Sequence, residues 1–122
     1  MTVRYQQEGK IIQYSNAGSA ISAGDIVKMG CIVGVALEDI AASTGVGSVC
    51  VEGVVSGVPK TTGTAWTVGL KLLWDVSATK FDSAAATPAT GDITGCAIAW
   101  EAASSGATTG TIKLGGFNNT VT

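Results

Sequence analysis

The sequence contains no histidine and few charged residues, and both shortages restrict what the protein can do. Only 13% of its residues are charged, about half the share usual in soluble globular proteins, whereas 46% are hydrophobic. Without histidine, a single chain cannot build a Ser-His-Asp or Cys-His catalytic arrangement. We therefore expect no enzyme, no cofactor and no metal. A largely neutral surface favours packing against other protein, in an oligomer or a larger assembly.

The chain also lacks a basic cluster and any long apolar run. Its seven Lys and Arg residues are scattered singly, and the net charge is −2, whereas duplex binding needs a clustered basic surface. Apolar runs such as Val33 to Leu37 are far shorter than the roughly 20 residues that span a bilayer. The first residues lack the apolar region of a signal peptide. We expect no nucleic-acid partner, no membrane, and folding in a cytoplasm.

The three cysteines are odd in number and widely spaced. Cys31, Cys50 and Cys96 have no nearby Cys or His partners, whereas zinc sites use closely spaced pairs and exported disulfide frameworks use an even number. Each lies in an apolar, strand-like run. We therefore expect buried, unreactive thiols.

Short runs rich in Val, Ile and aromatic residues occur along the chain, separated by Gly, Ser, Thr and Asp turns. No window carries a helical apolar stripe over three turns with a cap and a stop. The sequence therefore predicts one all-β domain over residues 1–122, a small barrel or sandwich of short strands. The predicted strands are Ile11 to Tyr14, Asp25 to Met29, Ile32 to Leu37, Ser48 to Val55, Leu70 to Trp74, Gly95 to Trp100 and Thr111 to Leu114.

Two segments of the sequence resemble each other. Residues 32–45 align without a gap on residues 93–106, and a two-residue insertion then matches Gly53 with Gly116. Together with a weaker upstream match, this predicts an internal pseudo-repeat with units at 22–56 and 67–117; chance similarity in an Ala/Gly/Ser-rich chain is the alternative. The glycines expected to shape turns in the two units are Gly24, Gly34, Gly45, Gly53, Gly69, Gly95, Gly106 and Gly116.

Residues that suggest chemistry do not recur in the repeat. Glu38, Asp39 and Cys50 align with Ala99, Trp100 and Lys113, so backbone geometry is retained and functional groups are not. Adjacent acids on a strand also point to opposite faces, which argues against acid/base work. The segment 57–63 has a proline before its lysine and no glycine there, so we expect a turn after a strand and no phosphate loop.

Several Gly/Ala segments, taken in order, resemble a family of small tailed-phage and prophage proteins. These are capsid decoration or cement proteins, often described as a domain of unknown function and sometimes labelled RecA/RadA recombinase. The recombinase label conflicts with the absent phosphate loop and the short chain. The resemblance covers nearly the whole chain and is carried by residues 21–27, 34–36, 41–45, 51–54, 73–75 and 79–80.

The resemblance implies a compact β-barrel or β-clip-like body that binds the outside of an icosahedral phage head and stabilises it. The implied partners are the major capsid protein and further copies of the chain, most often as a homotrimer and next as a homodimer, so the implied location is the virion. We expect residues 1–14 to form an N-terminal arm. A β-clip module that binds carbohydrate or another small molecule is the alternative. Candidate capsid or subunit contacts are Val3, Arg4, Tyr5, Tyr14, Trp66, Trp74 and Trp100.

Overall fold

The computed structural model describes residues 3–115 and 119–122, so the predicted structural glycine Gly116 lies outside the described residues. The described chain forms ten strands and no helix, which confirms the all-β prediction. It accordingly contains no helix long and apolar enough to cross a membrane. The strands are β1 (Ile11–Ser15), β2 (Ile26–Met29), β3 (Ile32–Ala36), β4 (Val46–Cys50), β5 (Gly53–Pro59), β6 (Lys71–Asp75), β7 (Lys80–Ser83), β8 (Ile93–Ala99), β9 (Thr109–Leu114) and β10 (Thr120–Val121).

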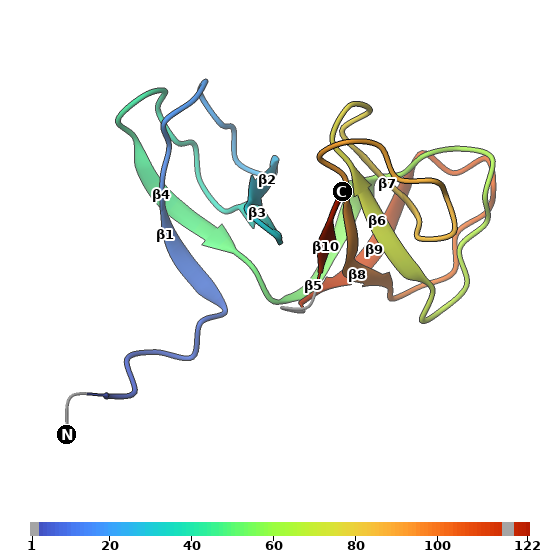
Figure 1. Cartoon of the computed structure of the whole chain (residues 1–122), viewed down its shortest axis with the longest axis horizontal. Helices are drawn as coiled ribbons and strands as arrows, with labels where there is room; N and C mark the ends of the chain where they lie inside the picture. Colours follow the sequence, from blue (N-terminus) through green and yellow to red (C-terminus); the bar gives the residue numbers. More distant parts are fainter. Residues whose placement is uncertain (1–2, 116–118) are drawn as a thin grey trace.

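The strands form two antiparallel sheets that lie side by side (Figure 1). The first sheet has the order β1-β4-β3-β2, and the second has the order β5-β9-β8-β6-β7 with β10 added beside β8. The single strand predicted over Ser48 to Val55 is wrong, because the chain leaves the first sheet after Cys50 and enters the second at Gly53. Gly53 has a φ of 132°, a backbone angle that residues with a side chain rarely adopt.

The second sheet curls without closing into a barrel. Its first and last strands, β5 and β7, do not pair as strands; Lys60, which follows β5, forms an isolated parallel bridge with Phe81 of β7. The turn predicted over residues 57–63 begins later than expected, since β5 continues to Pro59 and bends occupy residues 62–64. Gly57 instead lies where the β5–β9 register shifts, with a φ of 73°. The fold is thus a small β domain made of two open sheets.

Both sheets share one topology. The order β1-β4-β3-β2 of the first sheet is repeated as β5-β9-β8-β6 in the second. An isolated antiparallel bridge accompanies each, Ile21 to Ile40 in the first and Trp66 to Ala103 in the second. Strand pairing extends the match over residues 10–51 and 53–114, so each unit also includes an edge strand, β1 or β5, which the sequence comparison did not reach.

The gap-free alignment of the two units is correct at Ile32 and Ile93 but displaced by two residues from Gly34 onward. The Gly24 N–H donates to the Ala36 carbonyl (2.7 Å), and the Gly69 N–H donates to the Ala99 carbonyl (2.8 Å), so Ala36 corresponds to Ala99 and not to Ala97. The extra residues lie inside β8, where the β6–β8 register shifts between Thr94 and Ala97. Gly47 and Gly110 are therefore equivalent to each other, as Gly24 and Gly69 are.

Next to these two glycines, the two units place their large side chain on opposite sides of the equivalent bridge. A Cβ on Gly47 would lie 2.5 Å from the Ile40 side chain, whereas a Cβ on Gly110 would lie 2.5 Å from the Trp66 ring. Ile40 and Trp66 stand on opposite sides of the equivalent bridges. A large residue therefore fills each site from a different strand segment, with small Ala103 opposite Trp66.

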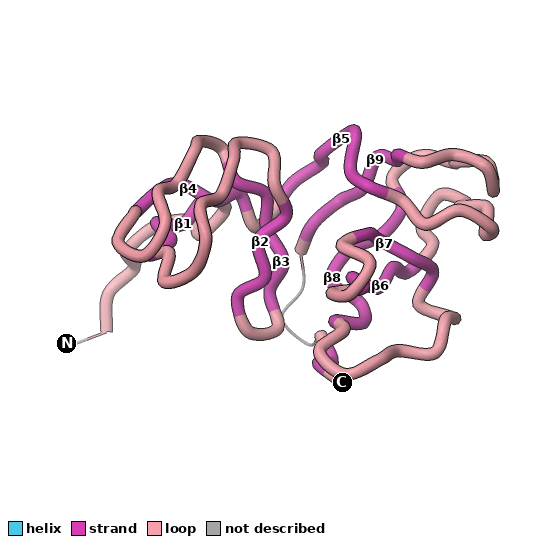
Figure 2. Tube along the Cα trace, turned by 90° about the horizontal axis from the view of Figure 1, so that it is seen from above, coloured by secondary structure: helices cyan, strands magenta, loops and turns pink. Residues whose placement is uncertain are grey.

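The β2–β3 hairpin belongs to both hydrophobic cores. Val27 and Ala36 are buried in the core of the first sheet, whereas Val33 is buried in the core of the second. Figure 2 shows β2 and β3 between the rest of the first sheet and the second sheet. Two hydrogen bonds join the parts: the Lys28 ammonium donates to the Gly91 carbonyl (2.9 Å), and the Asn119 amide donates to the Cys31 carbonyl (2.7 Å).

Candidate functional site

A row of exposed side chains crosses the outer face of the second sheet. Val54 and Ile98 are both register partners of Lys113, which places them on either side of it. Trp100 follows β8, is 45% exposed, and lies under the Lys113 ammonium, 5.4 Å from its ring centroid. We call Val54, Ile98, Trp100 and Lys113 the β8–β9 face. Large apolar groups exposed together favour contact with other protein.

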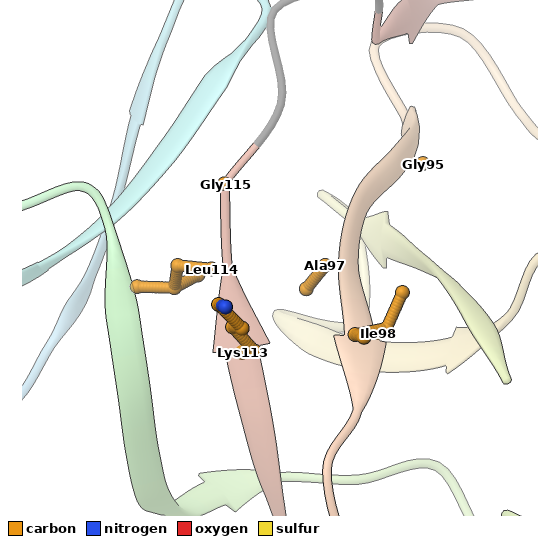
Figure 3. A pocket seen from close by; sticks show the side chains of 6 residues that line it. All are labelled: Gly95, Ala97, Ile98, Lys113, Leu114 and Gly115. Carbon is orange, nitrogen blue, oxygen red and sulfur yellow. The ribbon is translucent and has the colours of Figure 1, made fainter. Parts of the chain in front are cut away.

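A shallow depression of about 270 Å³ opens on this face. Figure 3 shows β8 and β9 diverging toward Gly95 and Gly115, beyond the last register pair of Ala97 and Leu114. Lys113 is the one charged residue in the lining, which leaves the depression mainly apolar. It does not offer the convergent polar groups that a carbohydrate site uses. The lining residues are Gly95, Ala97, Ile98, Lys113, Leu114 and Gly115.

The N-terminal segment extends away from the body (Figure 1). Val3 is 78% exposed, Tyr5 is 81% exposed, and Arg4 between them is also exposed. The strand β1 begins at Ile11, so the described residues of the predicted arm divide into exposed residues 3–10 and residues 11–14 of the first sheet. Because its apolar and aromatic side chains are exposed, this extended segment is suited to binding another surface.

The arm leads into an open sheet edge. β1 is the outermost strand of the first sheet and contains neither proline nor charge, the features that commonly protect such an edge. Lys10 and Asn16 hydrogen-bond toward β4, so by alternation the backbone groups of Ile11, Gln13 and Ser15 point outward. The Gln7 side-chain amide donates to the Ile11 carbonyl (3.3 Å), which leaves the rest of this edge free to accept a strand.

A second depression, of about 350 Å³, lies between the sheets. Asp25 and Lys80 both line it without forming an ion pair. Asp25 accepts a hydrogen bond from the Ser22 N–H (2.9 Å), so its carboxylate shapes the local turn. The lining residues are Gly24, Asp25, Ile26, Pro59, Trp74, Thr79 and Lys80.

The structure divides the predicted aromatic contacts. Trp66 and Trp74 are 1% and 5% exposed and belong to the core of the second sheet, and Trp74 also lines the second depression. Tyr14 is half-buried against the core of the first sheet. Tyr5 and Trp100 remain on the surface, on the arm and on the β8–β9 face.

The acids and thiols do not converge. Glu38 accepts a hydrogen bond from the Ser48 N–H (3.3 Å), whereas Asp39 accepts one from the Ala23 N–H (2.8 Å), so the two carboxylates serve separate loops. Within residues 3–115 and 119–122 no three His, Cys, Asp or Glu side chains gather in a group that could hold a metal ion. The chain thus places single acids where they satisfy backbone donors.

Burial of the cysteines differs from the prediction. Cys96 is buried, and desolvation raises the pKa of its thiol to about 11. Cys31 and Cys50 are only half-buried. Cys31 lies in the turn between β2 and β3, and Cys50 is the last residue of β4. The expectation of three buried thiols is therefore wrong for two of them.

The predicted structural glycines have different environments. Gly45 has no room for a side chain, since a Cβ there would lie 2.3 Å from the Ala41 carbonyl oxygen, and Gly34 is similarly enclosed. Gly106 has neither a positive φ nor a close neighbour. The others with described geometry adopt positive φ, and these are Gly24, Gly53, Gly69 and Gly95.

Sequence reasoning did not identify the β8–β9 face. It treated Lys113 only as the counterpart of Cys50, although strand alternation from buried Ile112 and Leu114 places Lys113 on the outside. The exposure of Val54 and Ile98 depends on which strands flank β9. The sequence alone does not predict which strands flank β9.

The comparison with protein families gives one match. The model of the family described as phage cement protein matches residues 6–114, which includes β1 through β9. No curated protein and no solved structure matches the chain. That family suggests a structural, capsid-associated role. The chain therefore belongs to the phage cement protein family, as its resemblance to capsid decoration proteins implied.

Proposed function

We propose that this protein binds the outer surface of an icosahedral phage head and stabilises it. The observation that carries the proposal is the family match over residues 6–114. A cement protein needs a firm body and adhesive surfaces and requires no catalytic group. The two joined cores supply such a body, and the exposed arm and the β8–β9 face supply such surfaces.

The N-terminal segment is the proposed attachment to the major capsid protein. Val3 and Tyr5 offer apolar and aromatic area, and the outward groups of Ile11, Gln13 and Ser15 offer backbone hydrogen bonds. Addition of a strand to an open edge combines both kinds of contact. Many copies on one head add avidity, so each attachment can be individually weak.

Self-association is the second part of the proposal, with a homotrimer first and a homodimer next. A symmetric oligomer carries several arms on one body and can bridge neighbouring capsid subunits. The virion surface is then the protein's working location, after synthesis in the host cytoplasm.

Removal of the arm tests the attachment. We expect a variant lacking residues 2–9 to lose at least tenfold in affinity for capsids stripped of cement protein, measured by co-sedimentation. The full chain should also raise the melting temperature of those capsids, and the shortened chain should not. Lys10 is retained because its carbonyl accepts the Val51 N–H.

Two controls make the result interpretable. The shortened chain should keep its free energy of unfolding within about 0.5 kcal/mol, because the deleted residues from 3 onward are exposed. The double variant Val3→Ser, Tyr5→Ser should weaken binding in the same direction without changing chain length. Undiminished co-sedimentation of both variants would exclude the arm as the attachment.

A further inference from the structure

Two lysines lie on either side of Ile98 on the outer face of the second sheet. Lys71 of β6 and Lys113 of β9 are both register partners of Ile98. Register partners in an antiparallel sheet point to the same face, and two strand spacings place the two lysine backbones roughly 10 Å apart. All three side chains are exposed. Lys71 therefore extends the β8–β9 face beyond Ile98 and adds a second cation to it.

Both lysines border the apolar depression on this face. Lys113 lines it directly, and so does Gly95 of β8. The Lys71 side chain runs over Gly95, since a Cβ at that glycine would lie 2.9 Å from the Lys71 Cε and 3.7 Å from its Nζ. Figure 3 shows Lys113 and Ile98 beside each other on neighbouring strands, with Gly95 further along β8. The depression thus has an apolar lining and a lysine beside each of the two strands that form it.

The positive charges of this face are not neutralised by acids of the chain. Within the described part of the chain, the one ion pair joins Lys10 to Glu8 on the arm. The acids nearest in sequence to the face are Glu52, just before β5, and Glu101, shortly after β8, and neither pairs with a lysine. The face therefore carries two unpaired cations in a protein whose net charge is −2.

We propose that this face binds an acidic segment of the capsid surface in which carboxylates flank a large apolar side chain. The apolar side chain enters the depression beside Ile98, and the carboxylates pair with the ammonium groups of Lys71 and Lys113. Opposite charges orient the association, whereas buried apolar area at the centre holds the complex together. This deepens the attachment part of the proposed function and rests on it, and it adds a second contact to that of the arm.

The arrangement of charge favours this occupant over two others. A two-fold pairing of the face with itself in a second copy brings like charges together, which is unfavourable. A nucleic acid binds a cluster of cations, whereas here the exposed apolar residues Val54, Ile98 and Trp100 lie between and beside the two lysines. Large apolar side chains with charges around them match a protein surface.

Charge reversal tests the electrostatic part, with capsids stripped of cement protein as the probe. We expect the double variant Lys71→Glu, Lys113→Glu to lose about tenfold in affinity at low salt, because attraction becomes repulsion at both positions. Raising NaCl from about 50 mM to about 500 mM should weaken wild-type binding and affect the double variant less, since salt screens exposed charges. Lys80→Glu, at an exposed lysine of β7, is the matched control for each single reversal and should bind like wild type.

The apolar part has a separate test. Ile98→Ser should weaken co-sedimentation about fivefold at both salt concentrations, because it removes apolar contact and leaves the charges in place. Val68→Ser, at a residue that is 70% exposed in a turn outside the face, should bind like wild type. Far-UV circular dichroism and denaturant unfolding report whether each variant retains the fold. Lys113→Gln, which keeps an aliphatic stem beside Trp100, gives a milder second substitution at that position.

The outcomes separate this inference from the proposed function. Wild-type protein that does not sediment with stripped capsids at either salt concentration overturns the proposed function together with this contact. Wild-type sedimentation that the double variant retains in full overturns this contact alone. Weaker binding of both the double variant and Ile98→Ser, with both controls unaffected, supports the inference.

Two further measurements exclude other occupants of the face. An oligomer that light scattering shows to dissociate in the double variant assigns the face to self-association and overturns the proposal. Wild-type binding to duplex DNA or to phosphatidylglycerol vesicles as tight as its binding to capsids assigns the face to anions in general, which also overturns it.

Discussion

Lys60 shows how a single position is adapted in each unit. It is fully buried, and its ammonium donates to the carbonyls of Thr61 (3.0 Å), Thr64 (2.8 Å) and Ala107 (3.5 Å). Asn16 occupies the equivalent position and donates to the Ser19 carbonyl (2.7 Å). Each side chain thus donates to backbone carbonyls of the loop that follows it.

Cys96 makes stability depend on pH in alkaline solution. Burial raises the pKa of its thiol to about 11, whereas in the unfolded chain the thiol ionises from about pH 8.5. Between these values the unfolded chain loses the proton first, so the free energy of unfolding falls as pH rises. The loss attributable to Cys96 should approach about 1.4 kcal/mol per pH unit within this window and be absent below it.

Comparison of wild type with Cys96→Ala isolates this effect. Denaturant unfolding at pH 7, 9 and 10.5 should show a steeper decline of the free energy of unfolding for wild type, since the two proteins differ only at Cys96. Equal slopes for the two proteins would refute the assignment. Cys50→Ala, at a half-buried position in the first sheet, is the matched control for the loss of a cysteine side chain.

At the scale of elements, sequence periodicity located seven stretches of strand but could not place their partners. β7 was missed because Lys80–Ser83 has Phe81 as its only apolar residue, and β10 is too short to show a pattern. The sequence alignment of the two units was displaced because β8 contains a bulge with two extra residues. Identical residues happen to coincide when the alignment continues through the bulge without a gap. Hydrogen bonds reveal the bulge, and composition does not.

The candidate surfaces were predictable only in part, for the same reason. Tyr5 is exposed because the arm precedes the first strand, which the polar sequence of that segment indicated. Trp66 and Trp100 both follow Ala/Gly/Thr-rich segments, yet one is in the core and the other is on the surface. Their difference depends on the neighbouring bridge and strand, which no local pattern specifies.

The contact between Gly110 and Trp66 fixes how β9 crosses the bridged segment. A Cβ at Gly110 would overlap the Trp66 ring at 2.5 Å, so Gly110→Ala should lower the free energy of unfolding by about 1–3 kcal/mol. Gly106→Ala, in the loop before β9 with nothing within 4 Å, should change it by less than about 0.5 kcal/mol. Equal stability of the two variants in denaturant unfolding would contradict this reading of the packing.

At the scale of the molecule, the shared β2–β3 hairpin should make the two sheets unfold together. Val33→Ala removes two methyl groups from the second core at a strand that also belongs to the first, and we expect a loss of about 2 kcal/mol. All three tryptophans lie in the second unit, so their fluorescence reports on that unit, and far-UV circular dichroism reports on both.

The two probes should give one coincident transition in wild type and in Val33→Ala. Val46→Ala, which alters an exposed residue of the first sheet, should leave the midpoint within error of wild type. A fluorescence midpoint distinct from the circular dichroism midpoint would mean that the hairpin does not couple the sheets.

The exchange of size between Ile40 and Trp66 also bears on how a chain with two similar halves avoids mispairing. Strands of one half could in principle take the places of their counterparts, within a chain or between chains, as in domain swapping. A hybrid that put Trp66 opposite Ile40 would overfill the site, and one that put Ile21 opposite Ala103 would leave a void. Each half therefore recognises its own segments by volume, and the duplicated topology folds into one arrangement.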